Sequence, residues 1–304
     1  MNFLLHTSSE GKSFALFLEE VLLHSIIEIL PAIPFLFAAY LLLEIIEHKT
    51  SGKSLRIMEK SGFLSSVFGG LLGAVPQCGF SSAAANFYTG RIISLGALIS
   101  VFLSTSDEML LIMISKNVPF TSLLTVLLYK IAVGIAVGLI IDLIIRLMKL
   151  PQKEIDIDAI CDEANCKCEN GIIRSTLHHT LSTGLFITVI TLLINTLIFF
   201  VGQESISLIL YDKPVISHFL AALIGLLPSC AVSVTLTDLC IERIITCGTM
   251  LSGLFANSGL GLLVLLRINK NKKENLLIIS ILLVSGFVFG LLADVVGFSE
   301  MFGF

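Results

Sequence analysis

The sequence is poor in charged residues, and this scarcity excludes a soluble protein. Charged residues occupy 14% of the 304 positions, whereas soluble domains carry about 25%. Hydrophobic residues reach 55%, and the mean hydropathy is +0.97. The apolar runs between the charges, such as 29–43, 120–141 and 275–293 with their flanks, are long enough for membrane-spanning helices, which need about 18 or more residues. The composition therefore predicts a polytopic membrane protein with no second, soluble domain.

Other absences narrow the function further. The net charge of −4 is spread over short loops, so the chain lacks the basic surface that nucleic-acid binding requires. The nucleotide-binding motif Gly-x4-Gly-Lys-Ser/Thr is missing. Cysteine occurs seven times, an odd number, and four cysteines fall in predicted membrane segments, so we expect no disulfide framework. We also expect no cofactor, and the sequence does not indicate an oligomeric state.

An internal repeat organises the chain. A shift of 152 positions (243 minus 91) aligns 73–142 with 225–294 without a gap. The identities include glycine, proline, cysteine, arginine and aspartate, whereas apolar composition alone would match mainly leucine with leucine. We expect a first repeat at 1–150, a cytoplasmic, acidic, cysteine-containing linker at 151–170, and a second repeat at 171–304.

The distribution of Lys and Arg predicts that the two repeats are inverted. These residues gather in three loops, 49–60, 146–174 and 267–273, which we expect to be cytoplasmic. The loops equivalent to the first and third, 202–214 and the one around Lys116, contain a single lysine each. Equivalent loops on opposite sides require an odd number of crossings per half. The interpretation places both termini outside the membrane.

Each half contains two apolar stretches that are too short to cross a bilayer. In the first half these are 62–75 and 79–89, and in the second 215–227 and 231–242. We predict that each pair forms a re-entrant helical hairpin, while 92–115 crosses fully. The expected fold is an all-α polytopic membrane protein of two inverted repeats, each with three spanning helices and one hairpin, which gives ten helical segments. A polar stripe of glutamates and a histidine on 14–28 predicts an interfacial N-terminal helix.

The hairpin tips are the first candidate site. Non-helical backbone inside a bilayer is tolerated where protein or a water-lined cavity satisfies it, and binding sites of inverted-repeat transporters lie at such breaks. The tips carry Gln77 and Cys78 after one proline, and Ser229 and Cys230 after its repeat mate. We expect these residues to bind substrate, with the two thiols as ligands for a thiophilic metal or trivalent arsenic. The alternative is that both cysteines are inert packing residues.

A polar run in the following segment is the second candidate. Ser106, Asp107 and Glu108 interrupt an apolar stretch, where intramembrane carboxylates are costly and usually mark an ion or proton path. The repeat mate retains polarity at Asn257 but loses both acids. We expect these residues to bind a cation or exchange it for a proton, and the alternative is a solvated loop near the outer surface. Asn86 and its mate Asp238 are candidates for additional oxygen ligands.

Two further patterns remain open. The linker cysteines Cys161, Cys166 and Cys168 lie among carboxylates and could capture a thiophilic ion from the cytoplasm, although their spacing is not that of a zinc pair. An ordinary solvated acidic loop explains them equally well. Asp142 and Asp294 each follow two glycines at fourth positions, which favours helix packing and capping.

Three runs in the first half resemble a known family. They extend from Gly73 to Asn86, from Tyr88 to Gly96 and from Phe102 to Met109. Together with Pro-Ser-Cys in the second half and the cysteine-rich linker, they are similar to the ten-transmembrane heavy-metal exporters, bacterial permeases labelled arsenic efflux protein or manganese transporter. The resemblance covers essentially the whole chain and implies export of a metal or metalloid from the cytoplasm.

These patterns together predict a secondary transporter and not an enzyme. It would export a manganese or other divalent heavy-metal ion, or arsenite, by alternating access, with protons as a candidate coupling ion. Thiol ligands would favour arsenic, zinc or cadmium, whereas the carboxylates and Asn86 would favour Mn(II). A passive ion channel and an intramembrane enzyme with Cys78 as nucleophile are the alternatives.

Overall fold

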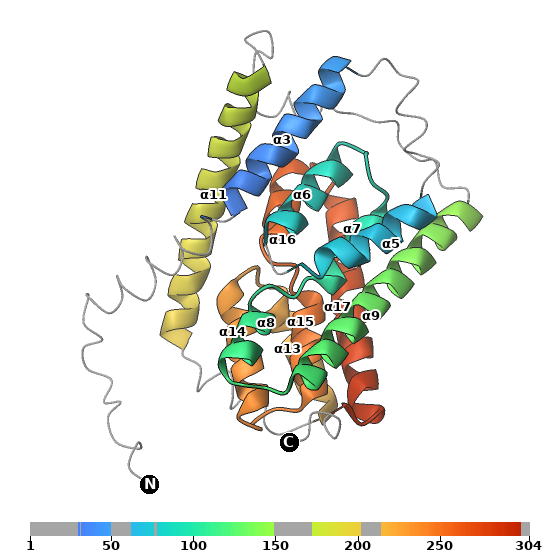
Figure 1. Cartoon of the computed structure of the whole chain (residues 1–304), viewed down its shortest axis with the longest axis vertical. Coiled ribbons are helices and arrows are strands. Elements are labelled where there is room, and N and C mark those ends of the chain that lie inside the picture. The colour runs from blue at the N-terminus through green and yellow to red at the C-terminus, as the bar shows by residue number, and fades with distance from the viewer. Residues whose placement is uncertain are drawn as a thin grey trace.

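The computed structural model describes residues 30, 32–49, 62–75, 78–148, 172–201 and 214–298 (Figure 1). Within these ranges the chain forms helices joined by turns, without a strand. The helices are α3 (Ala32–Lys49), α5 (Gly62–Gly73), α6 (Cys78–Thr89), α7 (Leu95–Ser104), α8 (Asp107–Ser115), α9 (Phe120–Leu147), α11 (Ile172–Val201), α13 (Pro214–Gly225), α14 (Cys230–Ile241), α15 (Cys247–Ala256), α16 (Gly261–Ile268) and α17 (Lys272–Val295). The predicted all-α fold class is confirmed. The expected interfacial helix at 14–28 lies outside the described residues.

The helix bounds repeat at the offset found in the sequence. Helices α13, α14 and α15 begin and end 152 residues after α5, α6 and α7, and α17 begins 152 residues after α9. The turn after the second hairpin arm repeats as well, because Arg91 and Arg243 both adopt left-handed φ angles, of 59° and 60°. The amide of the next isoleucine donates to the carbonyl five residues back, at 2.8 Å in one half and 2.9 Å in the other. The two halves therefore share local structure.

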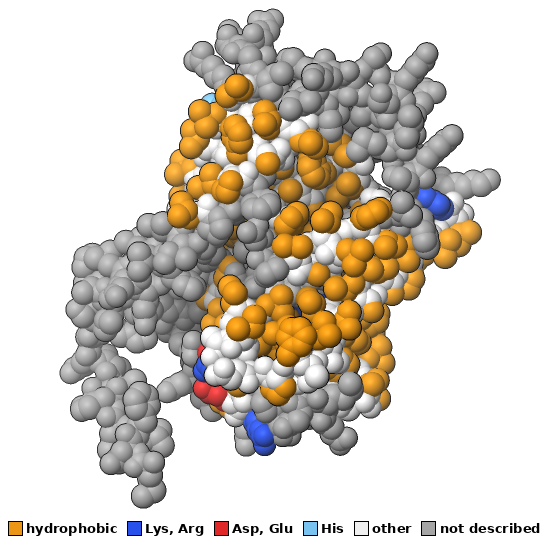
Figure 2. Space-filling model, in the orientation of Figure 1, with side chains coloured by type: hydrophobic (Ala, Val, Ile, Leu, Met, Phe, Trp, Pro, Cys, Tyr) orange, Lys and Arg blue, Asp and Glu red, His pale blue; other side chains and the backbone are white. Residues whose placement is uncertain are grey.

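Five described stretches are long and apolar enough to cross a membrane. Two of them are the interrupted pairs α7–α8 and α15–α16, which are 81% and 94% buried inside the protein. The other three, in α9, α11 and α17, are 33% buried and expose leucine, isoleucine and valine side chains. Figure 2 shows hydrophobic side chains over much of the described surface on the face in view. The interrupted helices therefore form the centre of a multi-pass membrane protein, and the outer helices expose apolar surface of the kind that suits lipid.

The short helices bring the two halves into contact. Helices α5, α6, α13 and α14 contain 12 residues each, or about 18 Å of helix against a hydrocarbon core of about 30 Å. The first arms pack within their own half, α5 on α7 and α9, and α13 on α15 and α17. The second arms pack across, α6 against α16 and α14 against α8. These contacts are equivalent under the repeat, so the two halves meet in a reciprocal manner.

The central spans are broken, which differs from the expectation of a continuous crossing at 92–115. The break between α7 and α8 falls at Thr105 and Ser106. Thr105 Oγ1 donates to Val101 O at 2.8 Å, and Ser106 Oγ donates to the carbonyl two residues back at 3.0 Å. Short polar side chains of this kind compete with helical hydrogen bonding. The equivalent break between α15 and α16 contains Gly259 at a φ of 58°, a conformation that glycine adopts without strain.

Asp142, near the end of α9, joins three helices. Its carboxylate accepts hydrogen bonds from Ser66 Oγ at 2.6 Å, Ser94 Oγ at 2.9 Å and the Gly96 amide at 3.0 Å. The amide belongs to the first turn of α7, which has no helical acceptor for it. Asp294 occupies the same position in the second half. The predicted packing and capping role of these aspartates is confirmed.

Candidate functional site

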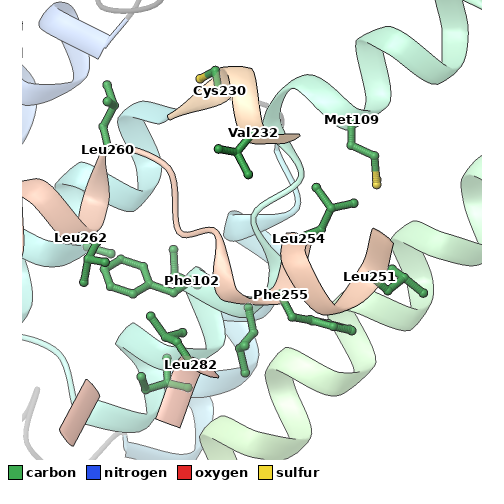
Figure 3. Packing of buried hydrophobic residues seen from close by; sticks show 14 of the residues in the cluster. Phe102, Met109, Cys230, Val232, Leu251, Leu254, Phe255, Leu260, Leu262 and Leu282 are labelled. Carbon is green, nitrogen blue, oxygen red and sulfur yellow. The ribbon is translucent and has the colours of Figure 1, made fainter. Parts of the chain in front are cut away.

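A small cavity lies where the two broken helices meet α14. Its volume is about 10 Å³, which is room for about one water-sized occupant. Figure 3 shows three of its lining side chains, Met109 on α8, Cys230 on α14 and Leu254 on α15. The full set of lining residues comes from both halves: Thr105, Ser106, Met109, Cys230, Ser233, Leu254, Asn257 and Gly259. The cavity is thus a shared feature of the two halves.

Asn257 fixes the second-half wall of the cavity. Its Nδ2 donates to Ser233 Oγ at 2.7 Å and to Ser229 O at 3.2 Å, both near the start of α14. Its Oδ1 accepts from the Gly259 amide at 2.9 Å. One amide side chain therefore satisfies the broken backbone between α15 and α16 and also ties that break to the hairpin tip. This is the requirement for non-helical backbone at membrane depth.

Cys230 is presented by a capped helix start. Ser229 is the N-cap of α14, and its Oγ accepts from the Ala231 amide at 3.2 Å and donates to Asn195 Oδ1 at 2.7 Å. The bond to Asn195 joins the start of α14 to α11. Cys230 is the first residue of α14 and is 3% exposed. The thiol therefore lies at the N-terminal end of α14, where it lines the cavity.

Lys130 binds two helix ends that border the cavity. It lies on α9 and is fully buried, at 0% exposure. Its Nζ donates to the carbonyl oxygens of Thr105 and Leu254, the latter at 3.0 Å. It also lies 5.8 Å from the centre of the Phe255 ring. The carbonyl ends of α7 and α15, which carry partial negative charge, are therefore held together by one ammonium group.

The cavity offers a mixed set of soft and hard donors. The soft donors are the Cys230 thiol and the Met109 thioether, and the oxygen donors include the hydroxyls of Ser106 and Ser233. Within the described part of the chain, no group of three or more His, Cys, Asp or Glu side chains is arranged to hold a metal ion. A soft ion with few protein ligands suits these donors better than an ion that needs a complete protein cage.

The position equivalent to Met109 in the second half is closely packed. The position equivalent to Met109 is Gly261, and a Cβ there would lie 2.7 Å from Phe102 Cε1 and 2.7 Å from Ser81 O. Phe102 is itself fully buried, and in Figure 3 it lies beside Leu262 on α16. Helices α16 and α6 thus pack closely, whereas Met109 and Leu254 leave space between α8 and α14. The packing around Met109 and around its repeat mate Gly261 therefore differs between the halves.

The structure brings together some of the predicted site residues. Ser106, Cys230 and Asn257 line the cavity, and Ser229 lies directly beside it. Asp107 and Glu108 are the first two residues of α8, immediately after lining residue Ser106, and Cys78 is the first residue of α6. The side chains of these last three residues are not described. Gln77 and the linker residues Cys161, Cys166 and Cys168 lie outside the described residues altogether.

The predicted oxygen ligands Asn86 and Asp238 are not among the residues that line the cavity. Asn86 is buried and donates from Nδ2 to Ser82 O in its own helix at 3.0 Å. Asp238 forms an ion pair with Lys116 at 3.3 Å, at the far end of α14. The structure therefore brings neither side chain to the cavity that the other residues share.

Sequence reasoning missed several residues of this cavity. Thr105, Met109 and Ser233 looked like ordinary neighbours of the motif residues, because their side chains carry no unusual chemistry. Lys130 did carry a signal, as a lysine in the middle of an apolar span is costly and usually functional. Its partners are carbonyl groups in both halves, which a sequence pattern cannot indicate.

Comparison with known proteins gives one match. The family model described as "Putative, 10TM heavy-metal exporter" matches residues 20–209, which is more than half of the chain. No curated protein and no solved structure matches significantly. The matched region includes the first hairpin, the first broken span and the start of the second half. The chain belongs to this family of ten-transmembrane heavy-metal exporters.

Proposed function

We propose that the protein is a secondary-active transporter that exports a thiophilic metal or metalloid ion from the cytoplasm by alternating access. The substrate would bind in the cavity between the broken helices. The observation that carries the proposal is the lining of this cavity, where Ser106 and Met109 of one half face Cys230, Ser233 and Asn257 of the other. A site built from both halves changes when they move relative to each other, as alternating access requires.

Two ion pairs between the halves support the inverted arrangement. Arg91, before α7, pairs at 2.9 Å with Glu274, which follows α16 in the other half. Lys116, after α8, pairs at 3.3 Å with Asp238, which precedes α15. Each pair joins the beginning of one central span to the end of the other. Spans joined in this way run antiparallel, and equivalent helices of inverted repeats do so.

The ligand set favours a soft ion. Thiolate and thioether groups select thiophilic ions, and a neutral hydroxylated metalloid could also bond to the surrounding hydroxyls. Asp107 and Glu108, at the start of α8, remain predicted ligands for a cation or a proton. A cytoplasmic capture site remains a prediction for Cys161, Cys166 and Cys168. Since the sequence has no nucleotide-binding motif, the energy would come from an ion gradient, with protons as the candidate.

The test is transport by purified protein in proteoliposomes. Uptake of arsenite, Zn²⁺, Cd²⁺ and Mn²⁺ would be measured for wild type, Cys230→Ser and Ser233→Ala. Ser280→Ala is the matched control, because Ser280 is exposed on α17 and its hydroxyl bonds to its own helix. We expect uptake of one thiophilic species to fall at least about tenfold in both cavity variants, the effect of about 1.4 kcal/mol. Full activity in both variants, or uptake of no ion by wild type, would contradict the proposal.

The same vesicles separate a transporter from a channel. A secondary transporter concentrates the ion when a proton gradient is imposed and stops when an ionophore collapses it. Flux that only follows the ion's own gradient, at unchanged rate without the proton gradient, would indicate a passive channel instead.

A further inference from the structure

A second pair of thiols lies away from the cavity. Cys240, in the last turn of α14, and Cys247, the first residue of α15, place their Sγ atoms 3.1 Å apart. Both cysteines are free, since a disulfide bond would bring the atoms to about 2.05 Å. Their side chains are 3% and 5% exposed. The turn between them is nearer the surface, with Glu242, Arg243 and Thr246 exposed. The pair thus lies directly beneath a short exposed turn.

The shared fold does not require this pair. The equivalent positions in the first half are Tyr88 and Leu95, which bury apolar surface at the same junction of hairpin and span. The aspartate network beside the pair is common to both halves, but its first-half member Ser66 is replaced by His218 in the second. The second half therefore has two thiols and an imidazole around this junction, and the first half has none of these groups at the equivalent positions.

The neighbouring polar groups are already committed to one another. Asp294 accepts from the Gly248 amide at 2.7 Å and from Thr246 Oγ1 at 2.5 Å, and His218 Nε2 lies 3.1 Å from it. In the described residues, this cluster does not provide the three or more ligands that a divalent metal ion would need. A closed zinc site takes four protein ligands. The available chemistry is therefore that of two adjacent thiols.

We propose that Cys240 and Cys247 form a dithiol site for a trivalent arsenical. Arsenic in this state is thiophilic and keeps a hydroxyl group as its own third ligand, so two protein thiols suffice. With As(OH)₃, two As–S bonds form while two As–O and two S–H bonds break, and two water molecules leave. Arsenic stays trivalent throughout, so no oxidant or reductant is required.

The site is separate from the transport cavity. Cys230 begins α14 and Cys240 lies ten residues later, about 15 Å along the helix. Binding is measured in detergent without transport, so the inference does not depend on the proposed function. If the dithiol site failed to bind arsenic, the cavity proposal would stand, and a failure of transport would leave this site intact.

The experiment uses the full chain purified in detergent under reducing conditions. Cys78, Cys161, Cys166, Cys168 and Cys230 would be replaced by serine, so that Cys240 and Cys247 are the remaining thiols. Arsenite would be added, and bound arsenic would be measured by mass spectrometry after gel filtration in excess glutathione, a monothiol competitor. Cys240→Ser and Cys247→Ser would be compared in this background, with Ser280→Ala as the matched control.

We expect one arsenic per chain in the background protein and in the Ser280→Ala control. Loss of either partner thiol should weaken binding at least about 100-fold, because the second bond of a chelate forms at high effective concentration. Unchanged binding in Cys240→Ser, or no bound arsenic in the background protein, would overturn the assignment. If the variants fail to fold, the wild-type protein decides the question. Alkylation of Cys240 and Cys247 by N-ethylmaleimide would be mapped on peptides, and arsenite should protect both thiols. Equal alkylation with and without arsenite would refute it.

Discussion

The hydrogen bonds of Asp142 predict a specific loss of stability when its carboxylate is removed. In Asp142→Ala the amide of Gly96, which now donates to the carboxylate at 3.0 Å, would stay buried without an acceptor. An unsatisfied buried amide costs about 1–3 kcal/mol, and the lost bonds from Ser66 and Ser94 add about 1 kcal/mol, since hydroxyls can rotate to other partners. We therefore expect a destabilisation of about 2–4 kcal/mol.

The conservative variant Asp142→Asn should behave differently. Its Oδ1 can still accept from the Gly96 amide, and its Nδ2 can donate to a serine hydroxyl, so the loss should stay below about 1 kcal/mol. Asp294→Ala should resemble Asp142→Ala, because Asp294 accepts from the equivalent amide of Gly248 at 2.7 Å. Ser280→Ala is the matched control for a substitution outside this network.

The assay is the fraction of protein that stays monodisperse after heating in detergent. Intrinsic fluorescence is unsuitable, as the chain has no tryptophan and four tyrosines. The expected loss corresponds to a fall in midpoint on the order of 5 °C or more for Asp142→Ala. A midpoint equal to that of the control would refute the capping role. A fall as large in Asp142→Asn would show that the charge, and not the bond to the amide, stabilises the site.

Three further predictions concern contacts between the halves. Lys130→Met removes the ammonium that joins the carbonyl ends of α7 and α15, so vesicle uptake per protein should fall at least about tenfold; wild-type uptake would contradict this. Arg91→Glu and Glu274→Arg should each impair uptake, and the double exchange should restore part of it, with a coupling energy of about 1 kcal/mol in a double-mutant cycle; additive losses would exclude the pair. Gly261→Val should reduce the thermal midpoint more than the Ser280→Ala control, because its Cβ would meet the backbone carbonyl of Ser81 at 2.7 Å; an unchanged midpoint would show that α16 does not pack against α6 as described.

The repeat was the most informative feature of the sequence. Glycine, proline, arginine and aspartate recur at the offset of 152 because they meet backbone requirements that both halves share. The left-handed turn at Arg91 and Arg243 and the caps at Asp142 and Asp294 are examples. Residues that satisfy local geometry leave a pattern that can be aligned, so the helix bounds of the two halves could be predicted closely.

The break in the first central span was predictable in kind but was missed in detail. The run from Ser104 to Ser106 contains residues that hydrogen-bond their own backbone, and this is a signal for a helix interruption. The two acids that follow this run indicate an ion or proton site, and this stronger signal hides the signal for a helix break. In the second half, Asn257 and Gly259 carry the same signal.

The contacts between the halves could not be predicted from the sequence. Lys130 reaches Leu254, Arg91 reaches Glu274 and Lys116 reaches Asp238 only because particular helices cross at particular angles. Each of these side chains is chemically compatible with many partners. Packing of the two halves selects one partner, and a pattern within one sequence contains no information about that choice.

Alkylation of Cys230 tests most directly whether the cavity between the halves is the substrate site. The rate of modification by a small maleimide would be measured on peptides of the full-length protein, with and without a saturating amount of the ion that the vesicles transport. If the ion binds in the cavity, it should slow alkylation of Cys230 by at least about tenfold, since a bound thiol is neither exposed nor nucleophilic. An unchanged rate at saturating ion would contradict the account.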